Sequence, residues 1–94
     1  MPLVFEWDPK KAKANHRKHG VSFDEARTVF EDPLAAIFVD EAHSIAENRE
    51  IIIGHSILRR LVLVCFTEGR KNYVRVISAR SATRREQIDY EEHF

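Results

Sequence analysis

The sequence contains few of the residues that several common kinds of protein chemistry require. Its only cysteine is Cys65, which excludes an internal disulfide framework. Three glycines leave little room for a glycine-rich phosphate-binding loop, and neither a serine nucleophile elbow nor a Cys/His pair is present. No segment approaches the roughly 18 apolar residues of a transmembrane helix, and the N-terminus lacks a signal-peptide pattern. These absences favour a cytoplasmic protein that makes no contact with a membrane.

The residues that are present indicate one globular domain spanning residues 1–94. With 44% hydrophobic and 32% charged residues, the chain does not have the composition of a disordered protein. Cys65 lies in an apolar run, where we expect a buried, inert thiol. The net charge is zero, but residues 10–20 carry +5 and residues 51–85 carry +7, whereas residues 21–50 carry −6. Such blocks can fold into a positive face for nucleic acid and a negative face for a basic partner, although folding can equally interleave them.

Changes in hydrophobic period and in turn residues divide the chain into predicted helices and strands. Asp8 and Pro9 predict the start of a first helix, and Gly20 predicts its end. Ser22 and Glu25 form a capping box that predicts the start of a second helix. The predicted strands are residues 3–7, 34–40, 49–55, 61–66 and 73–80, and the predicted helices are about 9–19, 22–32 and 83–92. The order β-α-α-β-β-β-β-α indicates an α+β fold, in which the helices pack against an antiparallel meander sheet with residues 61–66 as its central strand.

A run of arginines marks the junction between the last strand and the last helix: Arg75, Arg80, Arg84 and Arg85. Strict alternation places Ser78 on the face of Val74 and Val76, and it places Arg75 and Arg80 on opposite faces unless the strand bends. Thr83 and Glu86 form a capping box at the start of the helix. Guanidinium groups beside a helix N-terminus can hold a phosphate group. The alternative is that these arginines form ion pairs with the many acids of the chain.

The first predicted helix is short and strongly basic. Lys10, Lys13 and Arg17 share one face by helical spacing, which leaves Ala12, Asn15, His16 and His19 on the face toward the sheet. A helix of this composition is either a solvent-exposed surface or part of a contact with RNA or DNA.

Five histidines raise the question of a metal site. His16 and His19 are close enough on the helix to chelate, but no nearby Cys or Asp completes a set of ligands. The other histidines are scattered. We therefore expect neither a structural zinc site nor a cofactor.

Cleavage of RNA can proceed without a metal. A base takes the proton of the 2′-hydroxyl group, cations stabilise the charge on the phosphorane, and an acid protonates the leaving 5′-oxygen. The residues that could converge on such a site are Lys18, His19, His43, Glu47, Arg49, Arg75 and Arg80. Each has a structural alternative: His19 can cap carbonyl groups, Glu47 can pair with Arg49, and Arg75 can pair across the sheet.

Several blocks of the sequence are specific in combination. They are Phe5-Glu-Trp-Asp-Pro9, Lys18-His-Gly-Val-Ser-Phe23, Asp32-Pro33, Ile53-Gly54, Ile77-Ser-Ala-Arg80 and Ala82-Thr-Arg-Arg-Glu86, together with Asp40, His43, Glu47 and Arg49. In these blocks, and over nearly its whole length, the chain resembles the BrnT toxins of bacterial type II toxin–antitoxin systems, although Ser81 stands where another basic residue is common. The resemblance implies a RelE-like fold and a metal-independent ribonuclease that inhibits growth by cutting RNA.

The resemblance also implies a partner and a set of site residues. The partner is a BrnA antitoxin, which resembles a ribbon-helix-helix DNA-binding protein and whose complex with the toxin represses their own operon. Contact with DNA is then expected only through the antitoxin. We expect Arg49 and Arg80 to hold the scissile phosphate and Glu47 or His19 to transfer protons. The residues expected to contact the rest of the substrate are Lys13, Lys18, Arg75 and Arg84.

Two other functions fit the same residues. In the first, the chain is a binding module without catalysis, whose basic helix and arginine junction hold RNA, DNA or a protein partner. In the second, it is a stabilising subunit that binds only the antitoxin. A binding module retains RNA with intact ends in a salt-dependent manner, whereas an enzyme leaves new ends.

Overall fold

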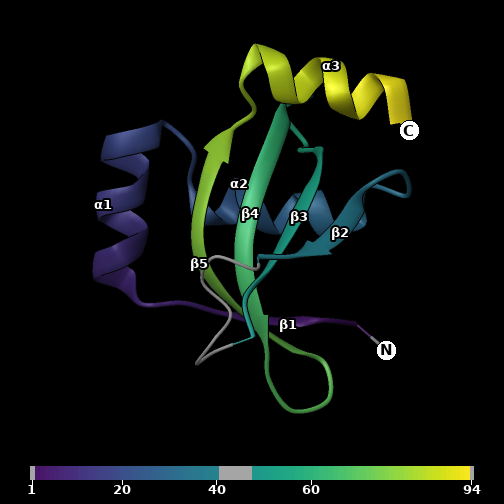
Figure 1. Cartoon of the computed structure of the whole chain (residues 1–94). Coiled ribbons are helices and arrows are strands. Elements are labelled where there is room, and N and C mark those ends of the chain that lie inside the picture. The colour runs from purple at the N-terminus through teal and green to yellow at the C-terminus, as the bar shows by residue number, and fades with distance from the viewer. Residues whose placement is uncertain (1, 41–47, 94) are drawn as a thin grey trace.

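Figure 1 shows the computed structural model of the chain, which describes residues 2–40 and 48–93. The strands are β1 (Val4–Glu6), β2 (Ala36–Val39), β3 (Glu50–His55), β4 (Leu61–Glu68) and β5 (Tyr73–Ser81). The helices are α1 (Pro9–His19), α2 (Phe23–Thr28), the short 3-10 helix η1 (Val29–Glu31) and α3 (Arg84–His93). The predicted element order and the α+β class are therefore confirmed.

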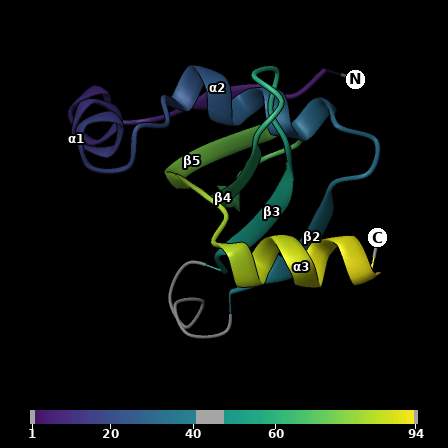
Figure 2. The same cartoon turned by 90° about the horizontal axis from the view of Figure 1, so that it is seen from above.

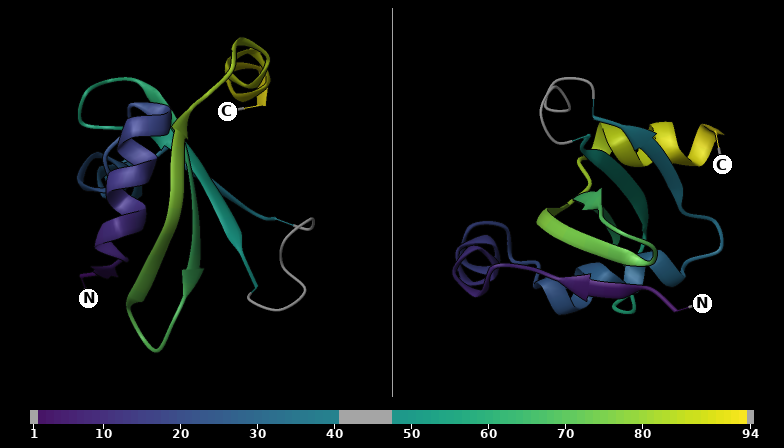
Figure 3. Two further views of the ribbon diagram at one scale, coloured as in Figure 1. Left: turned by 90° about the vertical axis from the view of Figure 1, so that its left-hand side faces the viewer. Right: turned by 90° about the horizontal axis from the view of Figure 1, so that it is seen from below.

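The strands form one sheet in the order β1-β5-β4-β3-β2. Strands β2 to β5 make the predicted antiparallel meander, with β4 in the centre. The meander is not the whole sheet, because β1 pairs in parallel with β5 and makes the sheet mixed. Helix α2 lies on one face of the sheet and α3 on the other (Figure 2), while α1 runs alongside β5 (Figure 3).

The main core lies between the sheet and α2 with η1. Phe23, Ala26 and Val29 recur on one side of this helical segment and are fully buried against the sheet. Phe30 adds ring contacts, with centroids 5.1 Å from Phe5 and 5.0 Å from Phe66. Burial of each large apolar side chain stabilises the fold by about 1.5–3 kcal/mol, so this face holds most of the stability of the domain.

Strand β3 approaches η1 and the loop after it so closely that position 54 requires glycine. A Cβ at Gly54 would lie 2.8 Å from the Cβ of Ala35 and 3.0 Å from Oδ2 of Asp32. The Asp32 carboxylate occupies this contact, where it accepts hydrogen bonds from the backbone N–H groups of His55 at 2.7 Å and Leu34 at 2.9 Å. One carboxylate thus ends η1 and holds the end of β3.

The predicted ends of α1 are confirmed. The Asp8 carboxylate accepts a hydrogen bond from the backbone N–H of Lys10 at 2.8 Å. Gly20 adopts the left-handed conformation, with φ 72°, and its N–H donates to the carbonyl of His16. Because glycine reaches this conformation without strain, it ends the helix directly after His19.

The capping box predicted at the start of α2 is only half present. The Oγ of Ser22 accepts a hydrogen bond from the backbone N–H of Glu25 at 3.0 Å. The Glu25 carboxylate instead accepts from Arg60 Nε at 2.7 Å, from Arg60 Nη2 at 2.6 Å and from Ser56 Oγ at 2.6 Å. Arg60 lowers the pKa of this buried carboxyl. A charge-assisted pair is stronger than a bond to a backbone N–H, which is why Glu25 turns away from Ser22.

A single amide side chain joins α1 to β5. Asn15 is buried on α1 and donates from Nδ2 to the carbonyls of Val21 and Ala79, both at 2.9 Å. Its Oδ1 accepts from the N–H of Ala79 at 3.1 Å. Strand β1 pairs with β5 only from Tyr73 to Arg75, so at Ala79 the Asn15 amide supplies the donor and acceptor that a neighbouring strand would supply.

A β-bulge in β5 changes which side chains face each side of the sheet. Cys65 and Phe66 are consecutive in β4, but they pair with Ser78 and Val76 of β5. Ile77 is therefore an extra residue in β5. The bulge reverses the alternation beyond it. Ala79 therefore continues the buried face of Val76, and Ser78 lies on the other face. The prediction that Ser78 shares the face of Val76 was wrong, because it assumed a regular strand.

The same bulge brings two arginines onto one face. Arg75 pairs with Thr67 of β4 and Arg80 with Leu63, and these partners are an even number of residues apart. Arg75 and Arg80 therefore share a face of the sheet, whereas strict alternation had placed them on opposite faces.

Helix α3 covers only part of the sheet face opposite α2. It contributes Tyr90 to a small second core with Ile53, Leu61, Leu63 and Ala82. The Tyr90 hydroxyl donates to the carbonyl of Leu34 at 2.9 Å, which holds the helix over the β2 side. The rest of this face, toward the bulge of β5, lies beyond the helix and carries the site described next.

Candidate active site

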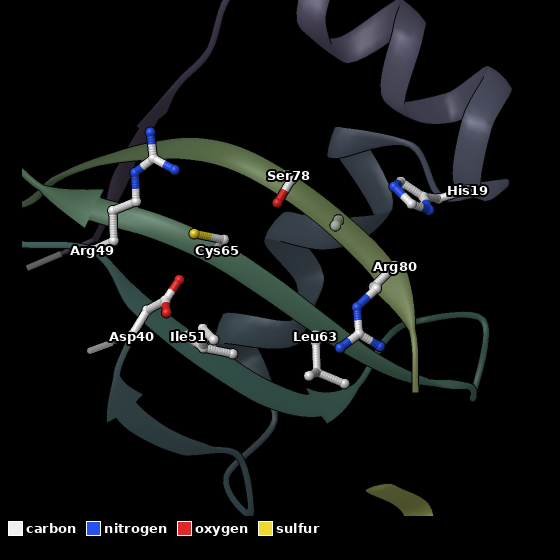
Figure 4. Close-up of a pocket in the computed structure, with 9 residues that line it drawn as sticks. His19, Asp40, Arg49, Ile51, Leu63, Cys65, Ser78 and Arg80 are labelled. Carbon is white, nitrogen blue, oxygen red and sulfur yellow. The ribbon is translucent and has the colours of Figure 1, made fainter. Parts of the chain in front are cut away.

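A surface cavity of about 350 Å³ opens on the sheet face that α3 leaves uncovered. Its lining residues, shown in Figure 4, are His19, Asp40, Arg49, Ile51, Leu63, Cys65, Ser78, Ala79 and Arg80. They come from the end of α1, from both sides of the loop between β2 and β3, and from the three inner strands. The fold therefore joins distant parts of the chain at this one place.

Three of the predicted catalytic residues meet here. Arg49 lies at one end of the cavity, and His19 and Arg80 lie at the other (Figure 4). His19 is the last residue of α1, Arg49 directly precedes β3, and Arg80 lies near the end of β5. Two cations and an imidazole around a space of this size can receive a phosphate group together with the sugar that carries it.

Arg80 is held by a carboxylate of α3. Its Nη1 and Nη2 donate to Oε1 and Oε2 of Glu86, both at 2.8 Å, and Nη1 also donates to the carbonyl of Ser81 at 3.3 Å. The hydrogen bond from Arg80 lowers the pKa of Glu86 to about 2, and the same pairing raises the pKa of Arg80. Both groups are therefore charged at any physiological pH.

Glu86 also completes the predicted capping box of α3. Its Oε1 accepts from the N–H of Thr83 at 2.8 Å, and the Thr83 Oγ1 accepts from the N–H of Glu86 at 3.2 Å. The prediction of a reciprocal box is confirmed. Because the same carboxylate binds Arg80, the start of α3 sets the position of a guanidinium in the cavity.

The floor of the cavity is apolar and includes a residue that was expected elsewhere. Ile51, Leu63 and Cys65 project from β3 and β4 on this face. Cys65 was predicted to carry a buried, inert thiol, but the residue is only half-buried and lines the cavity. In a central strand that is apolar on both faces, the sequence does not distinguish the core face from the cavity face.

Two polar lining residues were not predicted as site residues. Asp40 follows β2, and its N–H donates to the carbonyl of Arg49 at 2.9 Å, which places the two residues side by side. Its position one residue beyond a strand and at the start of the loop that leads to Arg49 is the signal that could have indicated it. Ser78 reaches the cavity only because of the bulge at Ile77, for which the sequence gives no signal.

Four other predicted site residues, Lys13, Lys18, Arg75 and Arg84, are not in the cavity lining. Lys18 is exposed and precedes His19, and Lys13 lines a different groove, between α1 and α2. Nη1 of Arg75 lies 3.7 Å from Oε2 of Glu6 on β1. This is the pair across the sheet that was considered as the structural alternative for Arg75. Arg84 is exposed in the first turn of α3. Glu47 lies outside the described residues.

No His, Cys, Asp or Glu side chains gather in groups of three or more that could hold a metal ion within residues 2–40 and 48–93. In this part of the chain, no helix is both long and apolar enough to cross a membrane.

Comparison with known proteins gives the family. The family model described as the ribonuclease toxin BrnT of type II toxin–antitoxin systems matches residues 7–86. The chain belongs to the BrnT family. The crystal structure of the ribonuclease toxin BrnT of Brucella abortus is similar, with a TM-score of 0.67 and 27% sequence identity over 89% of this chain and 99% of that one. No curated protein sequence matches the chain.

The BrnT match contains the described lining of the cavity. Each lining residue that the structure describes falls between His19 and Arg80, inside the matched residues, and the match extends to Glu86, which holds Arg80. Membership of the BrnT family confirms the class that the sequence blocks indicated, a ribonuclease toxin of a type II toxin–antitoxin system.

Proposed function

We propose that this chain is an endoribonuclease that cuts RNA without a metal ion in the cavity between Arg49 and Arg80. The observation that carries the proposal is the meeting of Arg49, Arg80 and His19 on one cavity, from segments far apart in the sequence. A surface basic patch needs no such convergence, because it binds by charge alone. Catalysis requires groups that are held around one reacting atom.

The three residues have distinct tasks in this reaction. The attack of the 2′-oxygen on the neighbouring phosphorus adds negative charge to the phosphoryl oxygens, and Arg49 and Arg80 stabilise that charge. His19 can take the proton of the 2′-hydroxyl or give one to the leaving 5′-oxygen, because an imidazole ring has one nitrogen that can accept a proton and one that can donate it. Glu47 is our candidate for the other proton transfer, and Lys18 contacts the RNA backbone beside His19.

The pairing of Arg80 with Glu86 is compatible with phosphate binding. An arginine has five N–H donors, and three of them go to Glu86 and Ser81. Among the described residues, the Nε–H and one Nη2 hydrogen have no further partner, so Arg80 can hold Glu86 and a phosphate oxygen together. Glu86 then fixes the direction of the guanidinium in the cavity.

We propose further that a BrnA-like ribbon-helix-helix antitoxin neutralises the chain and that their complex represses its own operon. The family supports a partner of this kind, because type II toxins are paired with antitoxins. Any contact with DNA is made by the antitoxin, and the toxin acts on RNA in the cytoplasm.

The test is to incubate the purified chain with total RNA in excess EDTA and to map the RNA ends. We expect new ends from the unsubstituted chain and from Arg70→Ala, which removes an exposed arginine in the turn between β4 and β5. We expect no new ends from Arg49→Ala or Arg80→Ala, with folding checked by circular dichroism. Cleavage by folded Arg49→Ala and Arg80→Ala would show that the site is elsewhere. Salt-dependent retention of intact RNA by every variant would identify a binding module instead.

The role of Glu86 can be separated from its role as a helix cap. Glu86→Gln keeps an oxygen for the N–H of Thr83 but removes the charge that Arg80 binds, whereas Thr83→Ala weakens the same cap and leaves the Arg80 pair in place. We expect Thr83→Ala to lower stability by about 1 kcal/mol with kcat unchanged. Glu86→Gln is expected to lower kcat roughly tenfold, because a guanidinium that is not fixed spends less time in the reactive position. Equal kcat values for the two variants would mean that Glu86 is only a cap.

A further inference from the structure

A second groove lies between α1 and α2 and, among the residues that the structure describes, shares none of its lining with the candidate active site. Its volume is about 450 Å³, and its walls include Trp7, Lys10, Lys13 and His16 on one side and Phe23 and Asp24 on the other. The cavity at Arg80 accounts for none of these side chains. Lys13, predicted to contact the substrate, is among them.

The α1 wall of this groove is a row of basic side chains. Lys10, Lys13 and His16 follow one another at three-residue spacing, so each is a surface neighbour of the next, along a row that turns about 60° around the helix at each step. The same spacing continues to His19, which lines the active-site cavity. Since a helix rises about 1.5 Å and turns about 100° per residue, the row rises about 14 Å from Lys10 to His19 while it winds roughly half-way around the helix. A few nucleotides of one RNA strand can span this length.

Trp7 gives the groove an aromatic surface at the start of that row. Its indole is half-buried and is held edge-to-face against Phe23, with ring centroids 5.7 Å apart and an interplanar angle of 79°. An aromatic ring beside cations is the arrangement that binds single-stranded nucleic acid, in which bases stack on the ring and phosphates contact the cations. Asp24, the acid of this groove, can accept a hydrogen bond from a base amino group.

We infer that this groove is a second RNA-binding subsite, which holds single-stranded RNA next to the segment that is cut. The inference rests on the proposed ribonuclease function. An acidic protein segment could also meet the lysines, but the continuation of the row into His19 favours the substrate, because the strand that enters the active site must pass that residue. The subsite gives Lys13 a contact with RNA outside the catalytic cavity.

The first measurement uses the fluorescence of Trp7, the only tryptophan of the chain. A 2′-O-methyl RNA of about 12 nucleotides, within the site size of single-strand binders, is bound but cannot be cut through its 2′-oxygen. We expect it to quench Trp7 on binding, whereas a 2′-O-methyl dinucleotide, which fills only the active-site cavity, leaves the emission unchanged. Binding of the longer RNA without any change in Trp7 emission would overturn the inference.

The second measurement uses charge variants with a matched control. Lys10→Gln/Lys13→Gln removes two charges of the groove, and Lys11→Gln/Lys71→Gln removes two exposed lysines that do not line it. For the groove variant we expect the salt dependence of binding to the longer RNA to fall by about 1.4 in log–log slope, since each lost phosphate contact contributes about 0.7 for a single strand. Affinity is expected to fall about tenfold, the upper range for two exposed ion pairs. The dinucleotide should bind all three proteins equally.

The outcomes separate this inference from the proposed function. If the unsubstituted chain cuts RNA and the groove and control variants bind the longer RNA equally, the subsite is wrong and the ribonuclease stands. If the groove variant loses binding to the antitoxin but keeps its binding to RNA, the inference of an RNA subsite is also overturned. If the groove variant alone binds the longer RNA weakly but the unsubstituted chain leaves no new ends, the subsite is supported and the ribonuclease is not.

Discussion

Replacement of Asn15 by alanine is expected to weaken the fold far more than its size suggests. Asn15 has an exposed fraction of 7%, and its amide makes three hydrogen bonds to backbone groups. In Asn15→Ala the N–H and carbonyl of Ala79 and the carbonyl of Val21 lose these partners in a buried setting. An unsatisfied buried group costs about 1–3 kcal/mol. The unpaired N–H should cost the upper half of this range. Each of the two carbonyls should cost only the lower end, because its oxygen has a second lone pair. We therefore expect the free energy of unfolding to fall by about 4 kcal/mol.

This loss is a large fraction of the total stability of a small domain, which is about 5–15 kcal/mol. For a chain of this length it corresponds to a fall in Tm of roughly 16–32 °C. The assay is urea unfolding followed by the emission of Trp7, whose ring packs on Phe23 in the native state. The m-value should stay the same, because the surface exposed on unfolding is nearly unchanged.

Two further variants make the test specific. Gln87→Ala removes an exposed amide from α3 and should change stability by no more than about 0.5 kcal/mol. Asn15→Asp keeps the shape and the acceptor for the Ala79 N–H, but it places a second carboxylate oxygen against two carbonyls. Its folded-state pKa is therefore raised, and its stability should increase as the pH falls. If Asn15→Ala is as stable as Gln87→Ala, the amide does not join α1 to β5 and the reasoning fails.

Three other substitutions test separate contacts. Gly54→Ala presses a methyl group against the loop after η1 and should lower the free energy of unfolding, measured by thermal denaturation, by about 1–3 kcal/mol. Unchanged stability would mean that this loop moves away without cost. Glu25→Gln weakens the charge-assisted bonds of Arg60, whose side chain is 41% exposed and can be solvated. We therefore expect the free energy of unfolding, measured by urea titration, to fall by about 2 kcal/mol. An unchanged free energy would mean that the pair contributes no more than a surface ion pair. The hydrogen bond with Glu68 and burial raise the pKa of Glu50 to about 7. Between about pH 4.5 and 7 the folded state therefore keeps a proton on Glu50 that the unfolded state has released. The stability of the fold should fall as the pH rises through this range. In Glu50→Gln this fall should disappear from pH-dependent Tm measurements, and its persistence would show that another group is responsible.

The helix ends and the element order could be predicted because their causes are local in the sequence. Asp8 and Gly20 act within one turn of α1, and the reciprocal box of Thr83 and Glu86 acts within four residues. The second use of Glu86, as the partner of Arg80, depends on how β5 meets α3 and could not be read from the capping pattern. The failure of the box at Glu25 has the same cause, since its partners lie beyond β3.

Prediction of the site was limited because the sequence does not show on which face of the sheet each strand side chain lies. The sequence blocks indicated His19, Arg49 and Arg80, which the fold brings to one cavity. The bulge at Ile77 was not predictable, because no glycine or proline marks it, and it decides that Ser78 faces the cavity. Cys65 was assigned to the core, because a strand that is apolar on both faces gives no sign of which face is covered.

The pairing of β1 with β5 has a consequence for the time at which the site is assembled. Among the described strands, the ribosome makes β1 first and β5 last, and in the sheet that they form β1 lies at the edge beside β5. Contacts between such distant segments form late in folding, because the intervening chain must be closed before they are gained. The wall of the cavity that carries Arg80, and the carboxylate of Glu86 behind it, do not exist until residues 80–86 have been made. A nascent chain that ends before Arg80 therefore lacks the candidate active site, even though α1 and the strands before β5 have already been made.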